Sequence, residues 1–274
     1  MNHARLASSI SCMVSGRGCV LRCAMRSAWP VLLMVAICVV QTRRIYQGVE
    51  DRNNEYPFVV ALLRVFKVRI CSGTAIHERW VLTTAHCNRA IYIQYGDMSI
   101  PRLNITKLSA VLKFLVHPNF QEYNYFPKHV RMYNDLGLLF VEKLPLEFVP
   151  MSGLDYTAMR GIPVTYVGLG VSNRSQKLDY DIMEVRQIGQ GVVSSCKDVV
   201  KHLFAFPKLC VSSRCKLPQS ALPGDSGGPL ILDGKIIGIT IAILYDLRIT
   251  VFTPVSPYLT WITTLIKEHE KKSN

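Results

Sequence analysis

The chain has 274 residues, of which 49% are hydrophobic, and it carries 32 basic and 19 acidic residues, a formal net charge of +13. A chain of this length can form either one large β domain or two small ones, and its apolar content is ample for a hydrophobic core. The basic surplus favours polyanions such as sulphated glycans, but charge alone rarely identifies a partner. We therefore interpret the charge as that of an ordinary soluble surface and predict no nucleic-acid partner.

Residues 1–44 differ in character from the rest of the chain, because they include arginines but neither lysine nor an acidic residue. The apolar run from Ala28 to Val40 is too short to span a bilayer comfortably and is typical of the h-region of a secretory signal. We predict an N-terminal extension, a signal peptide over about 25–38 that begins at Met25, and a short propeptide. The protein is then secreted and extracellular, with no membrane attachment after signal cleavage; an uncleaved anchor is the alternative.

From Ile45 to Asn274 we predict a single folded domain that is all-β apart from its end. Short runs rich in β-branched and aromatic residues recur between turn residues, a pattern typical of a barrel or sandwich. The predicted strands cover residues 58–63, 80–82, 91–95, 138–141, 164–167, 230–232, 236–243 and 250–253.

The C-terminal end has a helical pattern. Ser256 is predicted to cap this helix and Pro257 fits its first turn. Apolar residues then recur with helical spacing, and a charged stretch over 267–272 is predicted to be a solvated tail. The apolar positions are Tyr258, Trp261, Ile262, Leu265 and Ile266.

Three segments far apart in the chain carry the candidate chemistry. The glycine-rich string Pro223–Pro229 presents Ser226, and the string Thr83–Cys87 presents His86. A serine hydroxyl is a poor nucleophile near neutral pH until an imidazole takes its proton, so the two segments belong to one chemical argument. A third segment places Asp135 before an apolar strand. A bare Gly-Asp-Ser would be interpreted as a tight turn, but the full seven-residue string in this context favours a catalytic serine; the aspartate segment taken alone would be interpreted as a turn.

Together these strings resemble the active-site motifs of the trypsin/chymotrypsin family of serine proteases, and the order His, Asp, Ser is the one that this family uses. The resemblance covers residues 45–274 and implies two six-stranded antiparallel β-barrels with a C-terminal α-helix and the active site between the barrels. It implies that His86 is the general base, that Asp135 holds its tautomer and that Ser226 is the nucleophile. The N–H groups of Gly224 and Ser226 would form the oxyanion hole.

The segment around Arg44 and Ile45 resembles the activation junction of the same family. Cleavage after Arg44 by an activating protease would free the α-amino group of Ile45, which could turn inward and pair with Asp225. Burial of the Asp225 carboxylate without this α-amino group is unfavourable in free energy. The precursor would therefore hold the loop of Ser226 in an inactive arrangement. The alternative is a dibasic surface linker.

The resemblance also implies the disulfides Cys71–Cys87 and Cys196–Cys210, which suit a secreted chain. Cys215 is then left over, and an odd cysteine indicates an intermolecular partner or a free thiol, or else a merely unpaired one.

The substrate pocket departs from the family pattern. Its floor at Ser220 carries no charge, and the branched side chains of Ile243 and Thr250 stand where the resemblance implies glycines. We therefore predict cleavage after small apolar residues, although Asp246 in a neighbouring loop would favour basic substrates if it reached the pocket. Ile241 replaces a serine whose hydroxyl supports the aspartate in the family, which would lower the rate.

The sequence as a whole predicts a secreted serine endopeptidase made as a zymogen. Its expected partners are protein or peptide substrates, the activating protease and protein inhibitors. No histidine or cysteine spacing indicates a metal site, and no cofactor is expected. Two sequons, at Asn104 and Asn173, are compatible with glycosylation. The alternative function is that of a catalytically weak or inactive homologue that binds or regulates a partner.

Overall fold

The computed structural model describes residues 45–125, 129–170, 185–196, 207–214 and 217–273. The predicted signal peptide, Arg44, Cys215 and Asn173 lie outside the described residues. The chain divides into two units, and all the described residues belong to the second, Gln41–Asn274.

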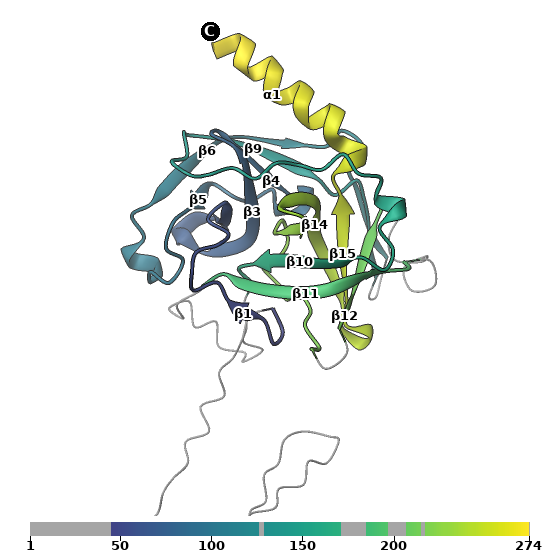
Figure 1. The fold of residues 1–274 in the computed structure, drawn as a ribbon. Helices are drawn as coiled ribbons and strands as arrows, with labels where there is room; N and C mark the ends of the chain where they lie inside the picture. Colours follow the sequence, from purple (N-terminus) through teal and green to yellow (C-terminus); the bar gives the residue numbers. More distant parts are fainter. Residues whose placement is uncertain (1–44, 126–128, 171–184, 197–206, 215–216, 274) are drawn as a thin grey trace, which may run out of the picture. The chain divides into compact units, whose positions relative to one another are not determined.

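The first half of this second unit is a closed antiparallel barrel of six strands (Figure 1). Its interior is lined by alternate residues of the strands, among them Val60, Leu62, Val81, Ile93 and Leu139, all of them fully buried. The strands follow the order β2 (Val59–Leu63), β3 (Arg69–His77), β4 (Trp80–Thr83), β9 (Gly137–Val141), β6 (Leu108–Val116) and β5 (Tyr92–Gln94).

The second half is built on the same plan. A seven-stranded antiparallel sheet begins with the two-residue strand β1 (Val49–Glu50), and pairing of β11 with β12 closes the other six strands into a barrel. The prediction of two six-stranded antiparallel barrels is thereby confirmed. The closed strands are β11 (Gln187–Ser194), β10 (Pro163–Gly168), β13 (Pro229–Leu232), β14 (Lys235–Leu244), β15 (Ile249–Pro254) and β12 (Leu209–Ser213).

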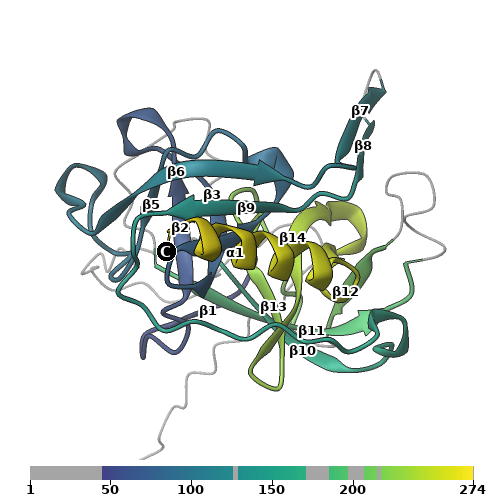
Figure 2. The same cartoon turned by 90° about the horizontal axis from the view of Figure 1, so that it is seen from above.

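Helix α1 (Leu259–Ser273) lies over the joint between the barrels (Figure 2), where Ile262 packs with Trp80 of the first barrel and Ile236 of the second. Two details of the predicted helix are wrong. A 3₁₀ turn (Ser256–Tyr258) precedes the helix, and Ser256 makes no capping hydrogen bond because Val255 holds the N-cap position. The helix also continues through the predicted tail: Lys267, Glu268, Glu270 and Lys271 are exposed as expected, whereas His269 packs on Trp80 and Phe140.

The remaining elements are connections. A hairpin of β7 (Gln121–Tyr125) and β8 (His129–Tyr133) projects from the first barrel (Figure 2). Neither the helix α1 nor any other helix in the described part of the chain is long and apolar enough to cross a membrane. The other 3₁₀ turns are Val65–Lys67, Ala85–Cys87, Arg102–Asn104, Tyr156–Ala158 and Tyr245–Leu247.

Both disulfides implied by the sequence are present. Cys71–Cys87 joins β3 to the 3₁₀ turn that carries His86. Cys196–Cys210 joins the segment after β11 to β12 in the second barrel. Each therefore ties a connecting segment to a strand of its own barrel.

Candidate active site

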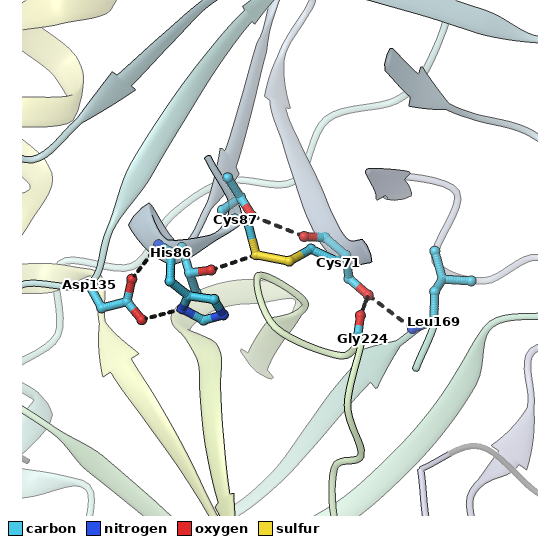
Figure 3. The surroundings of a disulfide bond; sticks show 9 residues. Cys71, His86, Cys87, Asp135, Leu169 and Gly224 are labelled. Atoms are coloured by element: carbon cyan, nitrogen blue, oxygen red, sulfur yellow. Dashed lines mark hydrogen bonds and ion pairs between the residues drawn. A yellow bond between two sulfur atoms is a disulfide. The ribbon is translucent and has the colours of Figure 1, made fainter. Parts of the chain in front are cut away.

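His86 and the fully buried Asp135 form a pair at the end of the first barrel. The Nδ1 atom of His86 lies 2.7 Å from Oδ2 of Asp135, and the backbone N–H of His86 donates to Oδ1 of the same carboxylate at 3.1 Å (Figure 3). The carboxylate has no exposed surface, whereas the His86 side chain is 25% exposed. Since a buried carboxylate accepts hydrogen bonds, the proton of the neutral ring belongs on Nδ1 and Nε2 is left free as a base.

Asn134 explains how the chain presents this carboxylate. Its backbone has a positive φ of 48°, which asparagine tolerates better than most residues. Its side chain donates to the carbonyl of Asn119 at 2.8 Å and accepts from the hydroxyl of Tyr258 at 2.9 Å. The segment is thus a turn, as its composition alone suggested, and the turn fixes the direction of Asp135.

The surroundings of His86 act on its pKa in opposite directions. Burial lowers the pKa, but the hydrogen bond and the negative charge of Asp135, with a contribution from Glu122 on β7, outweigh it. The pKa of His86 therefore lies above its ordinary value, as expected for an imidazole that must accept a proton.

Ser226 lies in a tight loop between β12 and β13. Gly224 and Gly227 have φ values of 94° and 85°, which side chains rarely allow. A Cβ on Gly227 would also collide with the Ser72 carbonyl and the Thr83 side chain. Ser226 remains partly exposed, so this loop presents a serine from a backbone that needs glycine on both sides.

The Cys71–Cys87 disulfide links the two halves of the site (Figure 3). Cys87 is the neighbour of His86, and the residue after Cys71 donates its backbone N–H to the carbonyl of Ser226 at 2.8 Å. The structure thereby brings His86, Asp135 and the loop of Ser226 to one place at the joint between the barrels.

Asp225 is buried beneath this loop, with 1% of its surface exposed. Its carboxylate accepts from the N–H groups of Gly170 at 2.6 Å and Leu222 at 2.7 Å. Ile45 is fully buried in the core of the second barrel, and the next residue, Tyr46, donates its N–H to the carbonyl of Ser220 at 2.8 Å. The chain after the predicted junction is therefore inserted into the same barrel as Asp225.

The predicted pocket residues are Ser220, Ile241, Ile243 and Thr250. All but the half-buried Ile243 are buried. The Thr250 hydroxyl accepts from the N–H of Ala221 at 3.0 Å, which fixes this branched side chain against the floor. Ile241 falls at a β-bulge between β14 and β15 and packs in a cluster that contains both cysteines of Cys196–Cys210.

The family model for trypsin matches residues 45–262. The chain belongs to the trypsin family. Among its relatives, Kallikrein-12 of Homo sapiens is 27% identical over 220 residues, 78% of this chain and 85% of that protein. Mast cell protease 2 of Ovis aries is 28% identical over 262 residues, 89% of this chain and 99% of that protein.

A solved structure shows the same fold. Neuropsin, a serine protease expressed in the limbic system of mouse brain, superimposes with a TM-score of 0.66 at 24% identity, covering 80% of this chain and 98% of that one. The family resemblance inferred from the motifs is thus confirmed, and this member of the trypsin family is a serine-type endopeptidase.

This trypsin-family site includes a buried cation that the sequence motifs did not indicate. Lys208 is 3% exposed and its Nζ donates to the hydroxyl of Thr253 at 3.3 Å. That hydroxyl in turn donates to the carbonyl of Asp135 at 3.3 Å. Burial lowers the pKa of Lys208 to about 8, against the opposing attraction of Asp135. Residues two apart on a strand face the same side, so the position of Lys208 two residues before the buried Cys210 is a sequence signal that Lys208 faces inward.

One grouping of potential metal ligands occurs within the described ranges, formed by Cys71, His86 and Cys87. The two sulfur atoms are bonded to each other, and a disulfide sulfur has no thiolate to offer a metal. The grouping is therefore a consequence of the disulfide beside the candidate base and does not fit a metal centre.

Proposed function

We propose that this chain hydrolyses peptide bonds through a triad of His86, Asp135 and Ser226. The observation that carries the proposal is the pairing of His86 with the buried Asp135, with Nδ1 and Oδ2 2.7 Å apart, at the same joint as the serine loop. The Ser226 hydroxyl attacks the substrate carbonyl carbon while its proton passes to Nε2 of His86. That proton then goes to the leaving amine, the acyl-serine forms, and water releases the acid by the same proton transfers in reverse.

The oxyanion hole proposed for this reaction consists of the N–H groups of Gly224 and Ser226. The positive φ of Gly224 and the hydrogen bonds that hold the neighbouring carbonyls support it. A single such donor contributes about 10²–10³ in rate in a related catalytic system.

We propose further that the protein is secreted as a zymogen and activated by cleavage after Arg44. The burial of Ile45 and Asp225 in one barrel supports a pairing of the freed α-amino group with this carboxylate. The apolar run in residues 28–40 supports secretion, and the exposed Asn104 is a candidate glycosylation site.

For specificity we propose small apolar residues before the scissile bond, because Thr250 is fixed against the floor and the branched Ile243 is its direct cross-strand partner on β14. A peptide library varied at this position tests the proposal on protein cleaved after Arg44, with Ser226→Ala as the control. The expected order is alanine and valine ahead of phenylalanine, arginine and lysine. A preference for arginine would refute the narrow pocket and indicate Asp246 as its determinant.

A partner-binding homologue without hydrolytic activity is the second candidate function. It is favoured by one observation, the burial of Ile241 beside the disulfide at the position where the family has a supporting hydroxyl. If protein that is cleaved after Arg44 and folded hydrolyses none of the peptides in the library, the second function is favoured over the first.

A further inference from the structure

Ser72 on β3 makes several hydrogen bonds to the serine loop and its surroundings, and no sequence motif indicated this role. It is fully buried. Its backbone N–H donates to the carbonyl of Ser226 at 2.8 Å, and its hydroxyl donates to the carbonyl of Gly224 at 2.9 Å. The same hydroxyl accepts the N–H of Leu169 at 3.0 Å, and these two side-chain bonds are the dashed lines that reach Gly224 and Leu169 in Figure 3. One side chain of the first barrel thus joins two segments of the second.

These contacts fix the plane of the peptide between Gly224 and Asp225. Its carbonyl is held by the Ser72 hydroxyl, and its N–H donates to the carbonyl of Leu222 at 3.1 Å. Because a peptide unit is planar, restraint of both polar ends fixes its orientation.

The peptide between Ser226 and Gly227 is held in the same way. Its carbonyl accepts from the Ser72 backbone, and its N–H donates to the carbonyl of Thr240 at 2.8 Å. The N–H groups proposed for the oxyanion hole belong to the two peptides that adjoin these fixed planes. Ser72 therefore constrains their directions through the adjoining peptides, together with the N–H of Gly228, which donates to the carbonyl of Asp225 at 2.9 Å.

We propose that the Ser72 hydroxyl is a positioning group of the oxyanion hole, an inference that rests on the proposed function. Removal of the hydroxyl leaves the Gly224 carbonyl and the Leu169 N–H buried without their partner. A buried polar group without a partner is unfavourable, so the loop shifts to recover a hydrogen bond. The Gly224–Asp225 peptide then rotates, and the donor beside it no longer points at the oxyanion.

The test compares Ser72→Ala with Ser109→Ala on the activated protein. Ser109 is a matched control, because it is also a buried serine of the first barrel whose hydroxyl donates to a backbone carbonyl, that of Glu142 at 3.0 Å. Ser72→Ala is expected to lower kcat about tenfold with KM nearly unchanged, since the oxyanion forms only in the transition state. Binding of a peptide aldehyde, whose adduct with serine carries such an oxygen, should weaken by the same factor. Ser109→Ala should change neither.

Two results would overturn the inference. One is a kcat and an aldehyde affinity of Ser72→Ala equal to those of the parent protein, even with a lower Tm, because that pattern describes a purely structural serine. The other result involves Ser72→Cys, which keeps a weaker donor of similar size. At a temperature well below every Tm, kcat is expected to fall in the order serine, cysteine, alanine at position 72, and an equal kcat for all three proteins would overturn the inference. An inactive parent protein would instead contradict the proposed function.

Discussion

Lys208 shows how a single buried charge affects both stability and the site. Its ammonium is removed from water, and its hydrogen bond to Thr253 places it behind the backbone of Asp135. A lone buried cation is among the least favourable groups in a core, and the negative charge of Asp135 offsets only part of that cost.

We predict that Lys208→Met stabilises the protein near pH 7. The folded pKa of about 8 lies below the ordinary 10.5, so the unfolded chain binds more protons between these values. The wild-type protein therefore gains stability as the pH rises through this window, and below it carries a cost of up to about 3 kcal/mol. Denaturant unfolding should give Lys208→Met a larger free energy of unfolding than the parent protein at pH 7, and this difference should decrease between pH 8 and 10.5.

Lys113→Met is the control for this prediction, because Lys113 is an exposed lysine on β6. It should leave the pH dependence of stability unchanged. A Lys208→Met variant that is less stable than the parent at pH 7 would show that the ammonium is a net stabilising partner of Asp135.

The residues of the candidate site divide into those a sequence can reveal and those it cannot. His86, Asp135 and Ser226 were predicted because their three segments together, in this order along the chain, resemble the motifs of one family. Ser72 could not, because its hydroxyl contacts a carbonyl 152 residues away and nothing in its own neighbourhood signals that contact. Lys208 was not predicted either, because its spacing of two from Cys210 is a weak signal, and the fold shows it to be buried.

At the scale of elements, strands with β-branched apolar runs, such as β14 and β15, were predicted closely. Strands β3, β6, β11 and β12 were missed, because glycine, serine, cysteine or lysine interrupts their apolar residues. Their pairing in a closed barrel satisfies backbone groups irrespective of side chain, so tertiary context overrides propensity there.

Helix α1 is the element that closes the joint between the barrels, and Ile262 is its most deeply buried side chain. We predict that Ile262→Ala lowers the free energy of unfolding by about 2–5 kcal/mol, through lost burial and the cavity left behind. Thr264→Ala on the exposed face of the same helix should change it by no more than about 0.5 kcal/mol. Equal effects in denaturant unfolding would mean that the helix does not pack as described.

At the scale of the molecule, the site depends on both barrels. His86 and Asp135 adjoin strands β4 and β9 of the first barrel, whereas Ser226 precedes β13 of the second. The segment that follows the predicted junction joins the second barrel through β1 and the Tyr46 contact to Ser220. In the proposed zymogen mechanism, proteolysis at the single bond after Arg44 acts on the serine loop through Ile45 and Asp225, both of which are buried in the second barrel.

Labelling with a fluorophosphonate probe tests the central claim most directly, because the probe reacts with an activated serine and needs no knowledge of the substrate. Protein cleaved after Arg44, with the Ile45 terminus verified, is compared with Arg44→Gln, which should resist that cleavage, and with Ser226→Ala. The proposed mechanism predicts rapid labelling of Ser226 in the cleaved protein, labelling slower by at least about tenfold in Arg44→Gln, and none in Ser226→Ala. No labelling of Ser226 in cleaved, folded protein would contradict the proposed mechanism.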